Sequence, residues 1–161
     1  MANNSKINVP ALIINVAITL SVGFIGSFFT RSSTDTWYRG INKPSFNPPD
    51  SVFGPVWTLL YILIGIAAYR VWQKRDTITH FPRTFAIYAI QLILNLLWSY
   101  IFFYLRDPAM ALVEIFILLA MIVVNAIVFY KVDKASGLLF IPYLLWVSFA
   151  TVLNYSIVQL N

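Results

Sequence analysis

The sequence predicts an all-α integral membrane protein, a bundle of five transmembrane helices forming a single domain over residues 1–161. Hydrophobic residues make up 60% of the chain, charged residues 11%, and the mean hydropathy is +0.77. A soluble domain of this length has too much surface for its volume to bury so many apolar side chains. The apolar stretches are continuous, whereas the strands of a membrane β-barrel alternate polar and apolar residues. We therefore expect helices in a lipid bilayer.

The five apolar runs fall near residues 9–29, 52–69, 84–105, 109–130 and 135–160. A hydrocarbon core of about 30 Å requires roughly 20 helical residues, which each run approaches or exceeds. The first run is long and no small-residue cleavage site follows it, so we expect a retained helix rather than a signal peptide. Asp107-Pro108 predicts the break before the fourth run. Pro142 either fits the first turns of the fifth helix or kinks it.

The first connecting segment, about residues 30–51, is the long one and is rich in proline and aromatic residues. Pro44, Pro48 and Pro49 fix backbone φ angles and lower the entropy lost on ordering. An interfacial aromatic belt would explain Trp37 and Tyr38 but not the density of prolines. We therefore predict that this segment is a preordered lid. The other connections are short, which favours antiparallel packing of consecutive helices.

The charge pattern and composition exclude several classes of function. The net charge of +5 is spread over connecting segments without a basic face or run, so nucleic acid is not an expected partner. The distribution of Lys and Arg favours a cytoplasmic N-terminus. Cysteine is absent, which excludes disulfides and thiolate chemistry. His80 is the single histidine, and no nucleophile or phosphate-loop motif is present, so we expect neither conventional catalytic residues nor a metal site.

Aromatic and polar residues fall on one face of three of the predicted helices. The second run carries Phe53, Trp57 and Tyr61; the third carries Gln91, Asn95, Trp98 and Phe102; and the fifth carries Tyr143, Trp146, Ala150 and Asn154. Spacings of three, four, seven and eleven residues place side chains on one helical face. Alternating topology puts most of these positions in the half of the membrane beneath the proline-rich segment. Apolar hollows with a few polar groups are typical ligand sites.

A structural role is the alternative for each polar residue inside a span. Asn and Gln also join helices through hydrogen bonds of about 1 kcal/mol each, and we assign Asn15 and Asn125 to that role. Glu114 is interpreted equally well as a proton relay or ligand contact and as an acid favoured by the helix dipole. Gly23 and Ser27 have the spacing of close helix packing, within the bundle or in a dimer.

Four segments together resemble the tryptophan-rich sensory protein/translocator protein family, also called the peripheral benzodiazepine receptor family. They read WYRGINKPSFNPPDSVFGPVWTLLY, QLILNLLWSYIFF, ALVE and PYLLWVSFATVLNY, and they cover the chain from Trp37 to Tyr155 in the family's order. The block from the first segment is highly specific. The resemblance implies a five-helix bundle, commonly a homodimer, with a pocket closed by the first loop. It also implies binding of porphyrins such as protoporphyrin IX, as a ligand and not as a covalently bound cofactor.

The resemblance also assigns pocket residues. The family's pocket tryptophans match Trp57 and Trp146, and its tyrosine, asparagine and alanine match Tyr38, Asn95 and Ala150. With the spacing argument, the expected ligand contacts and rim charges are Tyr38, Pro48, Pro49, Trp57, Tyr61, Gln91, Asn95, Trp98, Trp146, Ala150 and Asn154, with Arg31, Arg39 and Lys43 at the rim. We expect the porphyrin ring to stack on the two indoles and its propionates to reach the rim cations.

The sequence departs from the family in the motif proposed for cholesterol. Val152, Leu153 and Tyr155 are present, but the following SIVQLN holds no basic residue. High-affinity sterol binding is therefore not expected, and a bacterial cell membrane is favoured over a mitochondrial outer membrane.

Within the family resemblance, a tetrapyrrole receptor or sensor is the leading hypothesis. Light-dependent porphyrin degradation by Trp57 and Trp146, and transport of tetrapyrroles or sterols, are the alternatives.

Overall fold

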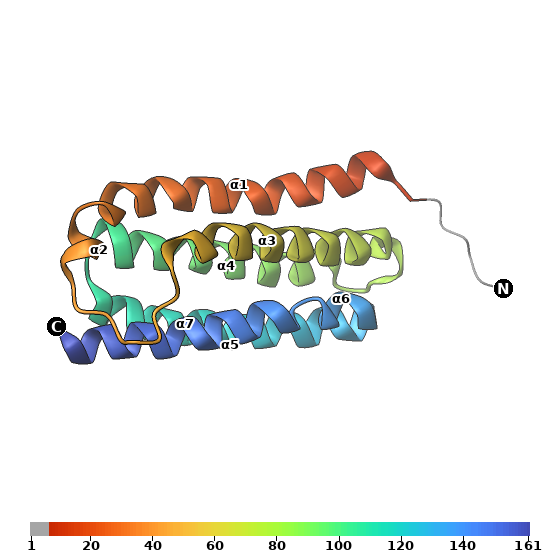
Figure 1. The fold of residues 1–161 in the computed structure, drawn as a ribbon. Coiled ribbons are helices and arrows are strands. Elements are labelled where there is room, and N and C mark those ends of the chain that lie inside the picture. The colour runs from red at the N-terminus through yellow and green to blue at the C-terminus, as the bar shows by residue number, and fades with distance from the viewer. Residues whose placement is uncertain (1–6) are drawn as a thin grey trace.

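Long helices run side by side along a common direction in the computed structural model, which describes residues 7–161 (Figure 1). The elements are α1 (Val9–Thr34), α2 (Trp37–Gly40), α3 (Asp50–Gln73), η1 (Arg75–Thr77), α4 (Phe81–Ser99), η2 (Tyr100–Tyr104), α5 (Pro108–Val132), α6 (Lys134–Leu138) and α7 (Ile141–Leu160). Within these residues five helical segments are long and apolar enough to cross a membrane, and no strand occurs. The predicted all-α membrane bundle is confirmed.

The helix ends differ from the predicted runs in physically understandable ways. α1 continues to Thr34 and α3 to Gln73, because polar residues extend these helices beyond the apolar stretch. The fifth run is divided into α6 and α7, and Pro142 lies in the first turn of α7, where its missing N–H costs no hydrogen bond. A π-helical turn, Tyr100–Tyr104, ends the third span. The sequence analysis did not anticipate this turn.

Side-chain caps begin three of the helices. The Oδ1 atom of Asn8 accepts a hydrogen bond from the backbone N–H of Ala11 at 3.1 Å, and Asp107 accepts one from Met110 at 2.9 Å. Asp133 caps α6 by accepting from the N–H of Ser136. Such caps satisfy amide groups that have no partner inside the helix. The helix break predicted at Asp107-Pro108 is present, and Asp107 is the N-cap of α5. The preceding residue, Arg106, has a positive φ of 57°.

The contact between α1 and α3 depends on small side chains. A β-carbon at Gly65 would lie 2.7 Å from the Cα of Val16, so only glycine permits this approach. The hydroxyl of Thr19 donates to the backbone carbonyl of Tyr61 at 2.7 Å across the same contact.

The prediction that Asn15 joins two helices was wrong. Its side-chain amide donates to the backbone carbonyl of Ala11, one turn back in α1, and not to another helix.

The main core lies between α3, α4, α5 and α7, around fully buried residues such as Ile64, Ile115, Ile122 and Tyr143. A second cluster lies at the α2 end, around Tyr38, Phe102 and Ile157 and their neighbours. Large apolar side chains on the outer helix faces are exposed, as a lipid environment requires. Unlike the other consecutive long helices, α3 and α4 have few close backbone contacts, so the prediction that they pack as near neighbours was too simple.

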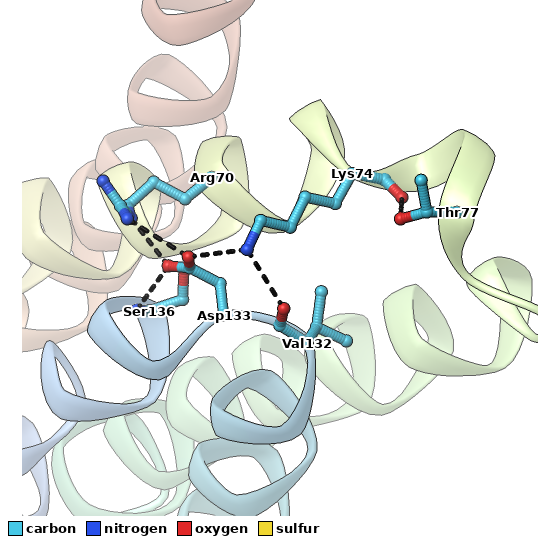
Figure 2. A network of polar contacts seen from close by, with 6 residues as sticks. All are labelled: Arg70, Lys74, Thr77, Val132, Asp133 and Ser136. Carbon is cyan, nitrogen blue, oxygen red and sulfur yellow. Dashed lines mark hydrogen bonds and ion pairs between the residues drawn. The ribbon is translucent and has the colours of Figure 1, made fainter. Parts of the chain in front are cut away.

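An ion network ties α3 to the start of α6 at the end of the bundle away from α2 (Figures 1 and 2). The Asp133 carboxylate accepts from Arg70 Nε at 2.7 Å, from Lys74 Nζ at 2.9 Å and from the Ser136 hydroxyl at 2.8 Å. Burial by itself would raise the pKa of the Asp133 carboxyl, but the hydrogen bonds from Arg70, Lys74 and Ser136 outweigh it and hold this pKa well below its ordinary value. The carboxylate therefore stays charged and holds the two helices together.

Candidate functional site

A cavity of about 650 Å³ lies at the α2 end of the bundle, between α1, α3, α4, η2 and α7. Its volume is in the range of about 300–1,000 Å³ that is usual for sites of small organic ligands. The expected site residues that line it are Tyr38, Trp57, Tyr61, Trp98, Trp146, Ala150, Asn154 and Arg31. Side chains of the second, third and fifth spans thus converge at one end of the bundle, as predicted.

Two indoles from different helices border this cavity. Trp57 on α3 stacks on Tyr61, with ring centroids 5.6 Å apart and planes inclined by 28°. Trp146 on α7 meets Phe53 edge to face, with centroids 5.9 Å apart. The Nε1 donor of Trp146 is buried and has no hydrogen-bond partner within residues 7–161. The cavity therefore has aromatic walls, whereas the Trp146 N–H itself is enclosed by protein and is not exposed at the cavity surface.

A polar network lies behind the aromatic wall and fixes the position of Tyr61. The Tyr61 hydroxyl donates to Asn95 Oδ1 at 2.5 Å, and Asn95 Nδ2 donates to the Tyr143 hydroxyl at 3.0 Å. Gln91 Nε2 donates to the same hydroxyl at 2.7 Å. Neither Asn95 nor Gln91 lines the cavity, so both lie one layer further from a ligand than the sequence analysis expected. Their hydrogen bonds indicate that Asn95 and Gln91 position the side chains of Tyr61 and Tyr143.

Trp98 and Asn154 meet at the boundary between the cavity and α5. Trp98 Nε1 donates to Asn154 Oδ1 at 3.2 Å, and Asn154 Nδ2 donates to the carbonyl of Pro108 at 2.8 Å. The Trp98 ring stacks on Phe102 of the π-helical turn, with centroids 5.1 Å apart. The indole N–H of Trp98 is therefore already satisfied, and this residue offers a ligand an apolar ring.

The segment between α1 and α3 contributes Tyr38 to the cavity wall. This side chain is buried, and its hydroxyl donates to Asn47 Oδ1 at 3.3 Å. Burial raises the pKa of Tyr38 to about 12, with the nearby Asp50 adding to the rise and the Asn47 hydrogen bond opposing it. Lys43 lies over the ring, with Nζ 4.6 Å from its centroid. Tyr38 therefore remains a neutral phenol held in place by its own segment.

Pro48 and Pro49, which were expected to contact the ligand, are not among the described residues that line the cavity, so the predicted lid is not shown by the structure. Pro49 instead precedes the first residue of α3. The stretch packs toward α7, where Phe46 meets Phe149 with centroids 6.4 Å apart. Asn42 is joined to the chain end, because its backbone N–H donates to Asn161 Oδ1 at 2.9 Å and its side chain donates to the Leu160 carbonyl.

The three predicted rim cations have different surroundings. Arg31 lines the cavity together with the acidic Asp50. Arg39 forms an exposed ion pair with Asp35 at 3.0 Å and does not line the cavity. Lys43 lies over the ring of Tyr38 and is also outside the lining. Only Arg31 is therefore placed to meet a charged group on a ligand without rearrangement.

The predicted ligand contacts did not include Gly23 and Ser27 of α1, nor Phe53, although Phe53 lies on the predicted aromatic face of the second span. Gly23 and Ser27 line the cavity, and a β-carbon at Gly23 would collide with the Tyr61 ring. Their four-residue spacing was visible but was interpreted only as helix packing. Phe53 lines the cavity together with Trp57 and Tyr61, as their four-residue spacing indicated.

Glu114 lies in the second turn of α5 and is buried, with both carboxyl oxygens unpaired within residues 7–161. It does not line the cavity, so a direct ligand contact is not supported. The helix dipole acts mainly within the first turn, so the dipole explanation is also weak at this position.

Asn125 was predicted to join helices through a hydrogen bond. Its side chain is buried without a hydrogen-bond partner in the described part of the chain, so that prediction was wrong.

Comparison with known proteins now decides the family. The model of the TspO/MBR family matches residues 15–160. The chain belongs to the TspO/MBR family. It is 44% identical over 154 residues to "Tryptophan-rich protein TspO" of Archaeoglobus fulgidus, covering 96% of this chain and 99% of the relative. It is 36% identical to "Translocator protein" of Homo sapiens, covering 92% and 88%, respectively. It is 39% identical to "Tryptophan-rich sensory protein" of Cereibacter sphaeroides, covering 79% and 78%. The predicted family resemblance is confirmed.

Proposed function

We propose that this TspO/MBR protein is a membrane receptor or sensor-like protein that binds tetrapyrroles of the protoporphyrin IX class, and related flat hydrophobic ligands, in the aromatic cavity. The observation that carries the proposal is that Trp57 and Trp146, from two different helices, border one cavity of about 650 Å³. A flat conjugated ring gains both apolar burial and ring stacking between such walls. The names of two relatives, "sensory protein" and "translocator protein", agree with ligand handling in a membrane.

The polar groups at the cavity suggest how the ligand is oriented. The Trp146 N–H is buried and unpaired, so it can donate to a polar atom of the ligand only after the indole rotates toward the cavity. Arg31 can form a charge-assisted hydrogen bond with a propionate at the outer end. Tyr61 is held by Asn95, which leaves the cavity wall ordered before the ligand arrives. A preordered wall lowers the entropy cost of binding.

Titration of detergent-solubilised protein with protoporphyrin IX tests this proposal. Binding should quench tryptophan fluorescence saturably, and Trp57→Phe/Trp146→Phe should weaken the affinity about tenfold because two ring contacts change. Trp72→Phe is the matched control, because Trp72 packs against Tyr69 away from the cavity. Non-saturable quenching, or equal affinity in the double variant and the wild type, would contradict the proposal.

Light-dependent degradation of porphyrin is the second candidate, and one contact favours it. Trp57 is stacked on Tyr61, whose hydroxyl is hydrogen-bonded to Asn95, so an indole and a phenol lie together at the cavity wall as possible redox partners of an excited ring. Illuminated protein should then convert the porphyrin to a new pigment, and the double Phe variant should not. Bleaching at the rate of free porphyrin would exclude this activity.

We also infer the setting in which the protein acts. A bacterial cell membrane is the environment that we propose, because a relative 43% identical over 91% of the chain comes from Chlorobaculum tepidum and another comes from Cereibacter sphaeroides. The exposed apolar faces of the long helices suit contact with lipid.

We further propose a homodimer, for which the exposed apolar surface of α1 offers an interface.

Transport of tetrapyrroles or sterols is the third candidate function, and measurement of flux into sealed vesicles distinguishes it from binding and degradation.

A further inference from the structure

The end of the bundle opposite the aromatic cavity contains a second hollow with different chemistry. It is lined by the end of α3, the end of α5 and the turn into α6, and its charged residues are Arg70, Lys74, Lys131, Asp133 and Lys134. Four cations thus surround one carboxylate. The ion network of Asp133 explains why Arg70 and Lys74 are present, but it does not explain Lys131 and Lys134 (Figure 2).

Several donors at this hollow have no acceptor in the described part of the chain. Arg70 uses Nε and Nη2 on Asp133, which leaves its Nη1 without a partner among residues 7–161. Lys131 and Lys134 are exposed, and neither forms an ion pair or side-chain hydrogen bond within those residues. The hollow therefore carries an excess of positive charge and free N–H donors, which suits a phosphate group.

The position of the hollow favours a lipid over a free ion. Lys131 lies at the end of one candidate membrane span and Lys134 at the start of the next, so both lie at the level of the headgroups. Tyr130, 45% exposed, has the amphipathic ring that is typical of the interface. Val124 and Ile127 are exposed on α5 at spacings of seven and four residues from Lys131, so an apolar surface continues from the hollow into the hydrocarbon.

The overall charge asymmetry of the bundle points the same way. The residues described at this end include six Lys and Arg side chains and two carboxylates, whereas the cavity end has four cations and three carboxylates. Basic pockets between membrane helices on the more positive side bind anionic headgroups, because those lipids concentrate in the cytoplasmic leaflet. The commonplace alternative is that these lysines only set the orientation of the protein.

We propose that this hollow is a binding site for the phosphate of an anionic phospholipid of the phosphatidylglycerol type, with Lys131 and Lys134 as its main contacts. Arg70 Nη1 adds a further donor from α3. One acyl chain lies along the exposed α5 surface at Ile127. A lipid in this place bridges α3 and the α5–α6 turn, and it reinforces the contact that Asp133 makes directly. The inference is independent of the ligand in the aromatic cavity.

Native mass spectrometry of the full chain in zwitterionic detergent, with matched amounts of phosphatidylglycerol and phosphatidylcholine, tests the site. The wild type should retain phosphatidylglycerol preferentially, and Lys131→Gln/Lys134→Gln should lower its apparent affinity roughly 30-fold, the effect of two interfacial charges. Arg75→Gln/Arg83→Gln removes two charges from the same end outside the hollow and should change the affinity little. Neither pair contacts Asp133, so both variants should keep the wild-type circular dichroism.

Three results would overturn the proposal. Equal retention of phosphatidylglycerol by the wild type and Lys131→Gln/Lys134→Gln would remove the assigned contacts. Equal losses in the two double variants would show a general charge effect of this end rather than a site. Calorimetric binding of inorganic phosphate without any preference for phosphatidylglycerol over phosphatidylcholine would assign the hollow to a free anion instead of a lipid.

Discussion

The helices are closely packed toward the α6 end of the bundle and are separated by a cavity at the α2 end. At the α6 end, small residues let the helices approach: Ala67 and Ala68 are fully buried, and Gly65 allows α1 to reach α3. At the α2 end, the rings of Trp57, Trp146 and their neighbours surround a cavity of about 650 Å³. The interfaces between helices are therefore closely packed toward the α6 end, where the second hollow lies among charged residues at the bundle end, and open at the α2 end. The side-chain size at the contacts explains the difference.

Hydrogen bonds at the α2 end restrain the aromatic side chains around the cavity. An empty space in a protein interior is costly, so neighbouring side chains tend to fill it. Tyr61 is held back by its hydrogen bond to Asn95, and Trp98 by its bond to Asn154. These hydrogen bonds restrain the two rings, so we expect them to resist rotation into the cavity.

The largest effect should come from breaking the closed end. Gly65→Leu places a β-carbon 2.7 Å from Val16 Cα and 2.8 Å from Thr19 Oγ1, so α1 must move away from α3. We expect destabilisation of about 3 kcal/mol, the upper range for overpacking. Thermal unfolding in detergent measures it. Gly54→Leu on the same helix is the control, because nothing lies within 4 Å of its β-carbon. Equal melting temperatures for the two variants would show that the close contact is unimportant.

The next effect concerns the ion network at the same end. Asp133→Asn should destabilise the protein by about 2 kcal/mol, less than for a fully buried pair because the Arg70 and Lys74 side chains are 42% and 46% exposed. The pKa of the folded Asp133 carboxyl is lowered, so its contribution is complete above the ordinary carboxyl pKa of about 4 and is lost as the pH falls below that value. Melting temperatures between pH 3 and pH 7 should therefore fall with acid more steeply in the wild type than in the variant.

The control for the ion network is Asp35→Asn, which breaks the exposed pair with Arg39 at the other end. Exposed pairs contribute little, so this variant should keep the stability and pH dependence of the wild type. If Asp133→Asn behaves in the same way as Asp35→Asn, the network in Figure 2 does not hold α3 against α6.

The smallest effect should appear in the segment beside the cavity. Asn42→Ala removes a side-chain bond between this segment and the Leu160 carbonyl, and Asn161→Ala removes bonds to Asn42. Exposed hydrogen bonds contribute about 1 kcal/mol or less, so the melting temperature should hardly change. Amide hydrogen exchange in residues 41–49 should become faster in both variants and fastest in the double variant, because each single variant leaves the hydrogen bonds of the other in place. Unchanged exchange would show that the chain end does not hold this segment.

Much of this architecture was predictable because a bilayer imposes simple rules on sequence. Continuous apolar runs fixed the helices, and the one-face spacing of Trp57 with Tyr61, and of Trp146 with Ala150, identified side chains that do line the cavity. The family motifs added Tyr38, which helical spacing could not supply because it lies outside the long helices.

Other features depend on three-dimensional details that periodicity does not encode. Asn95 lies on the predicted helix face, but its hydrogen bonds to Tyr61 and Tyr143 place it behind the wall. The role of Gly23 follows from a particular contact with the Tyr61 ring, not from its spacing alone. The path of the proline-rich stretch is set by the tie between Asn42 and Asn161, which are far apart in the sequence. Such long-range contacts could not be read from local patterns.

A crystal structure with protoporphyrin IX tests the central claim most directly, namely that the two indoles form the walls of one ligand site. We predict density for the ring between Trp57 and Trp146, with a propionate near Arg31. Density on the lipid-facing surface, with the cavity empty, would contradict the account.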